Sequence, residues 1–395
     1  MKSRSLLLML MLYSSLLSAD VNEIWNSTKI AGFVSQGYTR TSDNNFYGNS
    51  EKKSGSVSLR ELGLNVSSNL SPSIFSSAQI LARNTEQNED DGITLDYALI
   101  DYSRPISSEQ TYGIRIGRIK NPTGFYNETR DVPFTRSGVL LPQSIYFDRT
   151  RDLSLSGDGF HLYGESHQTD YTAEFTIGVG KPRTDKKSIT TSLLGPSAMG
   201  TLDSEVGYLW NILIHKNAYT LAYSGAFLQL NYRDSASLNR NDGNVKFLLN
   251  VFSFQYDAEY WAVTAEYADR RFDFTNLGAF LPFQEINGES YYLQLTSIIT
   301  PSLNFFLRYD VLYQNRKDRD GVKIASLTGG ATPAHTQFAK DWTVGLRWDI
   351  NQLWMLRLEH HWINGTAWLP RQNNPDAATT KKDWRMLAGI VSFRF

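Results

Sequence analysis

This chain of 395 residues contains no cysteine and no marked excess of charge of either sign. Without cysteine the fold cannot rest on disulfide bonds, so stability must come from extensive backbone pairing or a large core. The 39 basic and 40 acidic residues nearly cancel, whereas a nucleic-acid-binding protein would carry a basic excess. The composition therefore argues against a disulfide scaffold and against a nucleic-acid partner.

Long hydrophobic runs are also scarce, and the one clear example lies at the N-terminus. Lys2 and Arg4 precede an apolar run that ends at Leu17, and two small residues follow it. This is the layout of a cleaved secretory signal peptide. A membrane anchor is the alternative, but a spanning helix needs roughly 20 apolar residues. We expect residues 1–19 to be a signal peptide and residues 20–395 to form one domain.

Helical periodicity is hard to find, and alternation with period two replaces it along the mature chain. The last segment shows the pattern, with Leu387, Val391, Phe393 and Phe395 on one face and Ser392 on the other. A barrel strand exposes only every second residue to lipid, so a mean hydropathy of −0.36 does not exclude a membrane. About sixteen such strands are predicted, at 30–40, 56–68, 73–84, 92–103, 110–119, 158–166, 169–180, 204–215, 218–233, 244–257, 260–272, 288–299, 302–315, 340–350, 353–364 and 383–395.

The connections between these segments alternate between short and long. Long ones are expected near 41–55, 84–92, 120–157, 181–203, 234–243, 273–287, 316–339 and 365–382. Short turns at one end and long loops at the other are typical of a membrane barrel. The sequence therefore predicts an all-β fold, a transmembrane antiparallel up-and-down β-barrel.

Aromatic residues make up 13% of the chain and recur near the ends of the predicted strands. Strands favour aromatics in general, which explains their presence but not their placement. Their positions fit belts at the two membrane interfaces: Tyr208, Trp210, Tyr260, Trp261, Tyr291, Tyr292, Trp342, Trp348, Trp354, Trp362 and Trp384.

The third long loop, residues 120–157, is much longer than a connection needs, and such loops are usually functional or disordered. The sequence GRIKNPTG at 117–124 opens it and resembles a conserved stretch of Gram-negative outer-membrane porins, including phosphate-selective ones. This motif spans about 25 residues with its flanks, whereas the barrel pattern covers the mature chain. The acidic Pro-Glu-Phe-Gly-Gly sequence of some porin loops is missing, and no clear ladder of lysines indicates phosphate.

The resemblance implies a water-filled channel for passive diffusion of small hydrophilic solutes or ions across the bacterial outer membrane. It implies that the third loop folds into the lumen and sets the constriction. It also implies a homotrimer surrounded by outer-membrane lipid, with no enzymatic activity and no cofactor. A terminal aromatic strand resembles the signal read by the barrel-assembly machinery, which assigns that role to Phe393 and Phe395.

Period-two parity turns several charged side chains toward the lumen, since a lipid-facing Arg or Lys near the midplane costs about 2–4 kcal/mol. The inward acidic residues are Asp96, Glu266, Asp310 and Glu359. We hypothesise a transverse field at the constriction, in which Arg115, Lys120, Arg130, Arg136, Arg308, Arg347 and Arg357 face Glu128 and Asp131. The alternative is that these charges solvate a wide lumen or pin the loop to the wall.

The sequence also allows other functions. A channel selective for an anion or a small organic acid is the main alternative, and an outer-membrane hydrolase or an adhesin is less favoured. No Gly-x-Ser-x-Gly motif supplies a nucleophile, and no catalytic residue is proposed. His360 and His361 are adjacent and point to opposite faces of a strand, so we predict no metal site there. The loop carboxylates near Asp90 and Asp318 are most simply turn residues, although weak Ca²⁺ binding is conceivable.

Overall fold

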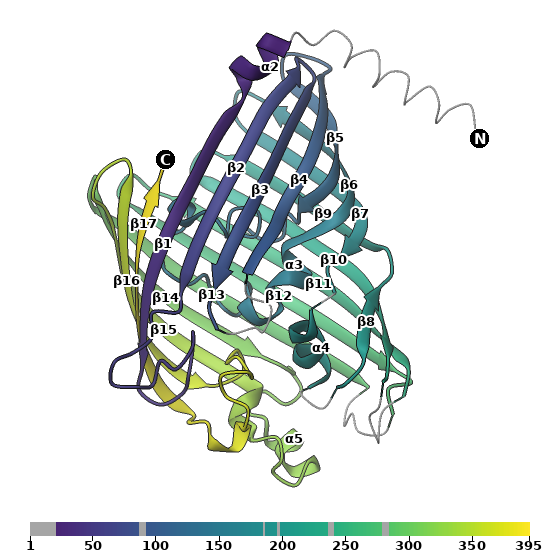
Figure 1. The fold of residues 1–395 in the computed structure, drawn as a ribbon, viewed down its shortest axis with the longest axis vertical. Coiled ribbons are helices and arrows are strands. Elements are labelled where there is room, and N and C mark those ends of the chain that lie inside the picture. Colours follow the sequence, from purple (N-terminus) through teal and green to yellow (C-terminus); the bar gives the residue numbers. More distant parts are fainter. Residues whose placement is uncertain (1–20, 87–91, 185, 196–197, 236–240, 279–283) are drawn as a thin grey trace.

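The alternating segments form one antiparallel sheet that closes on itself (Figure 1). The computed structural model describes residues 21–86, 92–184, 186–195, 198–235, 241–278 and 284–395, so the predicted signal peptide lies outside the described residues. The strands are β1 (Lys29–Thr41), β2 (Arg60–Ser71), β3 (Ile74–Asn84), β4 (Gly92–Pro105), β5 (Gln110–Lys120), β6 (Ser156–His167), β7 (Thr172–Pro182), β8 (Thr201–Ser204), β9 (Gly207–Lys216), β10 (Tyr219–Arg233), β11 (Gly243–Asp257), β12 (Trp261–Thr275), β13 (Glu285–Thr300), β14 (Leu303–Tyr313), β15 (Phe338–Asp349), β16 (Trp354–Gly365) and β17 (Asp383–Arg394).

Each strand pairs with its neighbours in chain order, and β1 pairs with β17 to close the ring. The predicted strand 204–215 is divided in two, because β8 and β9 both pair with β10 and together occupy one position in the sheet. The closed barrel therefore has sixteen strand positions, which confirms the predicted fold class. Predicted strand ends differ from the observed ones by a few residues; β2, for example, begins at Arg60 rather than at residue 56.

The side chains of each strand alternate between an exposed outer face and a buried inner one. In β16, Trp354, Leu358 and Trp362 are exposed, whereas Arg357 and Glu359 are buried. The predicted inward positions of Arg308, Arg357, Asp96, Glu266, Asp310 and Glu359 agree with their burial. Exposed large apolar side chains recur on the other strands, so the outer face is mainly apolar, as a barrel in lipid requires.

Short turns join the strands at one end of the barrel and long segments at the other. The turns include residues 72–73, 217–218 and 301–302, while the segments 42–59 and 314–337 are among the long loops. In Figure 1 the helices α4 (Lys187–Leu194) and α5 (Val322–Leu327) lie at the loop end, opposite α2 (Val21–Ser27). The predicted asymmetry of the connections is confirmed for the described strands.

Two of the predicted belt aromatics point into the barrel instead of toward lipid. Tyr292 and Trp384 are almost completely buried. The hydroxyl of Tyr292 donates a hydrogen bond of 2.9 Å to Glu266, and Trp384 packs beside Trp368 with ring centroids 5.3 Å apart. Placement near a strand end does not determine which face a ring occupies; its position in the period-two alternation does. The remaining helix is α3 (Arg151–Leu155), and no helix in the described ranges is long and apolar enough to cross a bilayer.

The chain end forms the seam between β17 and β1. The backbone N–H of Phe395 donates to the carbonyl of Gly32 at 3.0 Å, and Gly32 donates back at 3.1 Å. The Phe395 ring is 58% exposed and lies 6.3 Å from the ring of Phe393. The terminal residue therefore extends the closing pair of strands and presents its ring outward.

Deletion of Phe395 should lower the yield of folded barrel several-fold, because it removes two backbone hydrogen bonds at the seam and the terminal ring. Pores that do assemble should keep the wild-type conductance. Folded protein in isolated outer membranes, measured by heat-modifiable gel mobility, checks the yield. Phe160→Ala removes an exposed ring from β6 and serves as the control. Wild-type membrane levels of the deletion variant would refute an assembly role for this residue.

Candidate functional site

The connection between β5 and β6, residues 121–155, is the third long loop and is here called loop 3. It contains two single-turn 3₁₀ helices, Pro133–Thr135 and Asp148–Thr150, and then α3. Its apolar residues Val139, Leu140 and Leu141 are buried. Because a segment this long carries many backbone donors and acceptors, its position depends on which groups satisfy them.

The segment 138–140 of loop 3 is bound by side chains of β14 and β16. The carboxylate of Glu359 accepts hydrogen bonds from the backbone N–H groups of Val139 at 2.8 Å and Leu140 at 2.9 Å. Arg357 donates to the carbonyl of Gly138 at 2.5 Å, and Arg308 donates to that of Leu140 at 3.2 Å. A carboxylate and two guanidinium groups thus replace the backbone partners that a strand would have supplied.

A second carboxylate, Glu266 on β12, binds other parts of the same loop. It accepts hydrogen bonds from the backbone of Phe125 at 2.9 Å and from the hydroxyl of Tyr146 at 2.6 Å. Ser253 and Tyr292 of neighbouring strands also donate to it, at 2.6 and 2.9 Å. Four donors therefore satisfy this buried carboxylate, and two of them belong to loop 3.

The start of loop 3 is held to β4 and β5 by ion pairs. Lys120 lies 2.9 Å from Asp96 and 2.8 Å from Asp131, and Arg151 pairs with the other oxygen of Asp131. Burial alone would raise the pKa of Asp131, but the charges of Arg151 and Lys120 outweigh it and hold this pKa well below its usual range. Removing one partner of such a buried pair is strongly destabilising, since an uncompensated charge would remain.

Asp148 is the centre of another ionic cluster, which joins the far part of loop 3 to β3 and to the loop between β1 and β2. It lies 2.8 Å from Arg83 and 3.1 Å from Arg130, and Tyr47 donates to it at 2.9 Å. Burial opposes ionisation of Asp148, but Arg83 and Arg130 keep its pKa below the ordinary value. A carboxylate with a depressed folded-state pKa keeps its stabilising charge until the pH falls through that value, so these contacts persist in mild acid.

Arg115 keeps 28% of its side-chain surface accessible, and Arg347, another predicted site residue, keeps 20%. Arg115 lies 3.1 Å from Asp101 of β4 and its guanidinium stands 4.4 Å from the centre of the Tyr163 ring. Glu128 is exposed in loop 3 and interacts electrostatically with Arg115. Arg115 and Glu128 are therefore an oppositely charged pair of the predicted site in which both side chains keep accessible surface.

The other predicted site residues contact loop 3 or belong to it. Arg136 lies 3.4 Å from Glu61 on β2. Arg347 pairs with Asp349 and also donates to the carbonyl of Phe134 at 3.1 Å. Together with Lys120, Arg130, Asp131, Arg308 and Arg357, they bind the loop to the wall or to itself. The transverse field stays a prediction, and Arg115 and Glu128 are the oppositely charged pair on which it can be tested.

Sequence reasoning missed the part played by His361. It lies between two carboxylates, 2.7 Å from Asp341 and 3.0 Å from Glu359, and thereby supports the acceptor that holds Val139 and Leu140. Glu359 and His361 are two residues apart on one strand, so their shared inner face was readable from the sequence. Among the described residues, no group of three or more His, Cys, Asp or Glu side chains is placed so that it could hold a metal ion. Asp318 accepts backbone hydrogen bonds from Lys323 and Ile324, as a turn residue does.

This closed barrel with an apolar outer face is the fold of Gram-negative outer-membrane porins. An anion-selective porin from Comamonas acidovorans superposes with a TM-score of 0.58 at 10% identity, covering 93% of this chain and 99% of that one. The outer-membrane channel DcaP of Acinetobacter baumannii gives 0.56 at 10% identity, with 93% and 97% covered. OmpF of Salmonella typhi gives 0.55 at 11% identity, with the same coverage.

The likeness lies in the fold and not in the sequence. No protein-family model matches the chain. No curated protein matches it either. At identities of 8–11%, residue roles do not transfer from the solved structures.

Replacing Glu359 by Gln should loosen loop 3 locally. The two carboxylate oxygens now face three groups, the N–H of Val139, the N–H of Leu140 and the ring of His361, whereas an amide has a single acceptor oxygen. An unsatisfied buried donor costs about 1–3 kcal/mol, so the amide hydrogens of Val139 and Leu140 should exchange roughly 10- to 100-fold faster. Hydrogen exchange of the refolded barrel in detergent measures this rate. Glu165→Gln changes a carboxylate paired with His167 and should leave both amides protected. Equal protection in the two variants would contradict the anchoring role of Glu359.

Proposed function

We propose that the protein is an outer-membrane porin, a water-filled channel through which small hydrophilic solutes or ions diffuse passively. The observation that carries this proposal is the attachment of loop 3 to inward-facing side chains of a closed sixteen-strand barrel. Glu266 and Glu359 lie near the middle of β12 and β16, so a loop bound to them narrows the cross-section well below the rim. Loop 120–157 is thus the constriction of the proposed channel.

Passive diffusion needs no chemistry from these residues. Loop 3 excludes solutes that are too wide for the constriction, and charged side chains that stay accessible to water select solutes by the sign of their charge. No observation favours a catalytic function: the sequence offers no nucleophile motif, and the buried carboxylates of Glu266 and Glu359 accept hydrogen bonds from loop 3. An outer-membrane location follows from the same proposal, with export by the predicted signal peptide and insertion by the assembly machinery.

A homotrimer is part of the proposal. One structural neighbour, an outer-membrane protein of Vibrio cholerae named OmpT, is described in a trimer form, with a TM-score of 0.55 at 8% identity. Chemical crosslinking of the purified protein in detergent, followed by mass measurement, distinguishes a trimer from a monomer.

Planar-bilayer recording of the purified protein in a series of KCl concentrations tests the channel itself. A porin gives discrete conductance steps that rise with salt concentration. A protein that inserts without conductance steps would disprove the proposed function.

A second candidate is a channel selective for anions or small organic acids, and the wetted guanidinium of Arg115 favours it. Arg115→Gln should move the reversal potential in a KCl gradient toward cation selectivity, and Glu128→Gln should move it toward anion selectivity. Both follow from removing one fixed charge beside the ion path. Arg118→Gln is the control, because its exposed ion pair with Asp158 lies on the opposite face of β5 and contributes little to stability. Unchanged potentials in both variants would eliminate the transverse field.

A further inference from the structure

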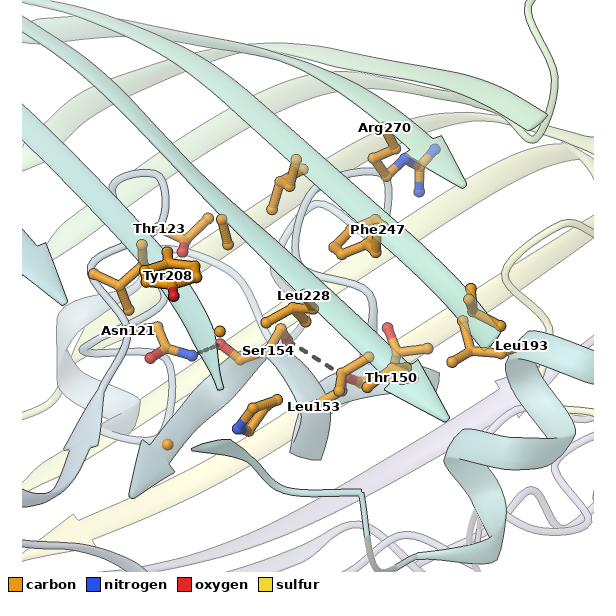
Figure 2. A pocket seen from close by; sticks show the side chains of 18 of the residues that line it. Asn121, Thr123, Thr150, Leu153, Ser154, Leu193, Tyr208, Leu228, Phe247 and Arg270 are labelled. Carbon is orange, nitrogen blue, oxygen red and sulfur yellow. Dashed lines mark hydrogen bonds between the residues drawn. The ribbon is translucent and has the colours of Figure 1, made fainter. Parts of the chain in front are cut away.

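A cavity of about 170 Å³ lies between loop 3 and the inner faces of β10, β11 and β12. Figure 2 shows its walls, with Leu228 and Phe247 from the strands, Leu153 from α3 and the guanidinium of Arg270. None of these residues belongs to the carboxylate anchors of loop 3. The cavity is therefore a separate feature of the lumen.

The wall of this cavity departs from the usual chemistry of a barrel interior, which is polar. Consecutive inward positions carry Leu228 and Leu230 on β10, then Phe247 and Leu249 on β11. Leu230 is buried against Leu153 and α4, whereas Leu228 and Phe247 keep part of their surface open to the cavity. An apolar surface left open inside a polar lumen marks a binding site rather than a packing requirement.

The charged groups around the cavity are all basic. Arg149, Lys181 and Arg270 line it, and no acidic residue of the described chain does. Arg270 donates to the hydroxyl of Ser290 at 2.7 Å, and its Nε has no partner among the described atoms. Two carboxylates interact electrostatically with Arg270: Asp269, which pairs with Arg316, and Asp310, of which one oxygen accepts from the backbone of Ser144 and the other has no partner among the described atoms.

Arg149, on loop 3, also has no ion-pair partner among the described residues. It lies over the ring of Phe147 and donates a long 3.4 Å hydrogen bond to the carbonyl of Leu369, while its Nε has no partner in the described structure. Burial and repulsion from Arg371 lower the pKa of Arg149 to about 9. A guanidinium with this deficit of negative charge favours an incoming anion.

We propose that this cavity binds an apolar monocarboxylate, an acid with a small ring or branched alkyl body and one carboxylate. The carboxylate pairs with Arg270 and Arg149, and the body lies against Leu228 and Phe247. The size is suitable, because an engineered protein cavity of about 150 Å³ holds benzene. This inference deepens the proposed channel function by naming a class of solute, and it rests on that function.

Benzoate is the probe, with benzamide as its uncharged analogue and acetate as the carboxylate without a ring. Isothermal titration of the detergent-solubilised protein should show binding of benzoate and none of the other two at equal concentration. In planar bilayers, benzoate should interrupt or reduce the KCl current at concentrations where acetate and benzamide do not.

Single substitutions locate the site. Arg270→Gln and Arg149→Gln should each weaken benzoate binding roughly 10- to 100-fold, the loss expected for a hydrogen bond to a charged group. Leu228→Asn should weaken benzoate binding without creating acetate binding. Arg271→Gln is the matched control, since Arg271 is the next residue on β12 but is exposed and paired with Asp273. It should bind benzoate as the wild type does.

The outcomes separate the two proposals. Conductance steps without benzoate binding would overturn the carboxylate site and leave the channel intact. Binding of benzoate by a protein that shows no conductance would overturn the channel and keep the site. Equal binding by the Arg270→Gln, Arg149→Gln and Arg271→Gln variants, or equal binding of benzoate and benzamide, would also overturn the site.

Discussion

Every backbone N–H and C=O group that faces lipid must find a partner within the protein, because hydrocarbon offers none. This single requirement accounts for the ring of paired strands, for the absence of an open edge between β1 and β17, and for the exchange of two hydrogen bonds between Phe395 and Gly32. A closed up-and-down sheet of even strand number also places both termini at the same end of the barrel.

The same requirement continues inside the barrel, where it is met differently. Loop 3 has no neighbouring strand, so side chains of the wall take over as partners of its backbone: Glu359 accepts from Val139 and Leu140, and Arg357 donates to Gly138. Charged groups suit this task because their hydrogen bonds are stronger than those of neutral groups. A charged side chain on the inner wall can therefore either bind loop 3 or interact with a solute. An atom whose hydrogen bonds go to the loop has little capacity left for a solute.

The period-two alternation predicted the strands, their approximate number and the inward direction of Arg308, Arg357 and Glu359. It could not predict which inward charged side chains bind loop 3, because the path of that loop is not periodic. Its contacts also join residues more than 200 positions apart, as in the hydrogen bond from Val139 to Glu359. Tyr292 and Trp384 are a different case: proximity to a strand end suggested lipid, whereas the alternation, which sets Trp384 on the face opposite Leu387, turns such rings inward, toward Glu266 and Trp368.

The inner wall is divided accordingly. On β14 and β16 several inward positions are charged and bind the loop, with Arg308, Arg357 and Glu359 almost completely buried. On β10 and β11 they are apolar, and the nearby guanidinium of Arg270 lacks a carboxylate partner in the described structure. Loop 3 is also bound to Glu266 on β12 and, through Gly124, to Ser224 on β10, yet these contacts leave Leu228 and Phe247 only partly covered. The loop is thus held by polar and charged positions of the wall, and the apolar positions of β10 and β11 between them stay partly open beside Arg270.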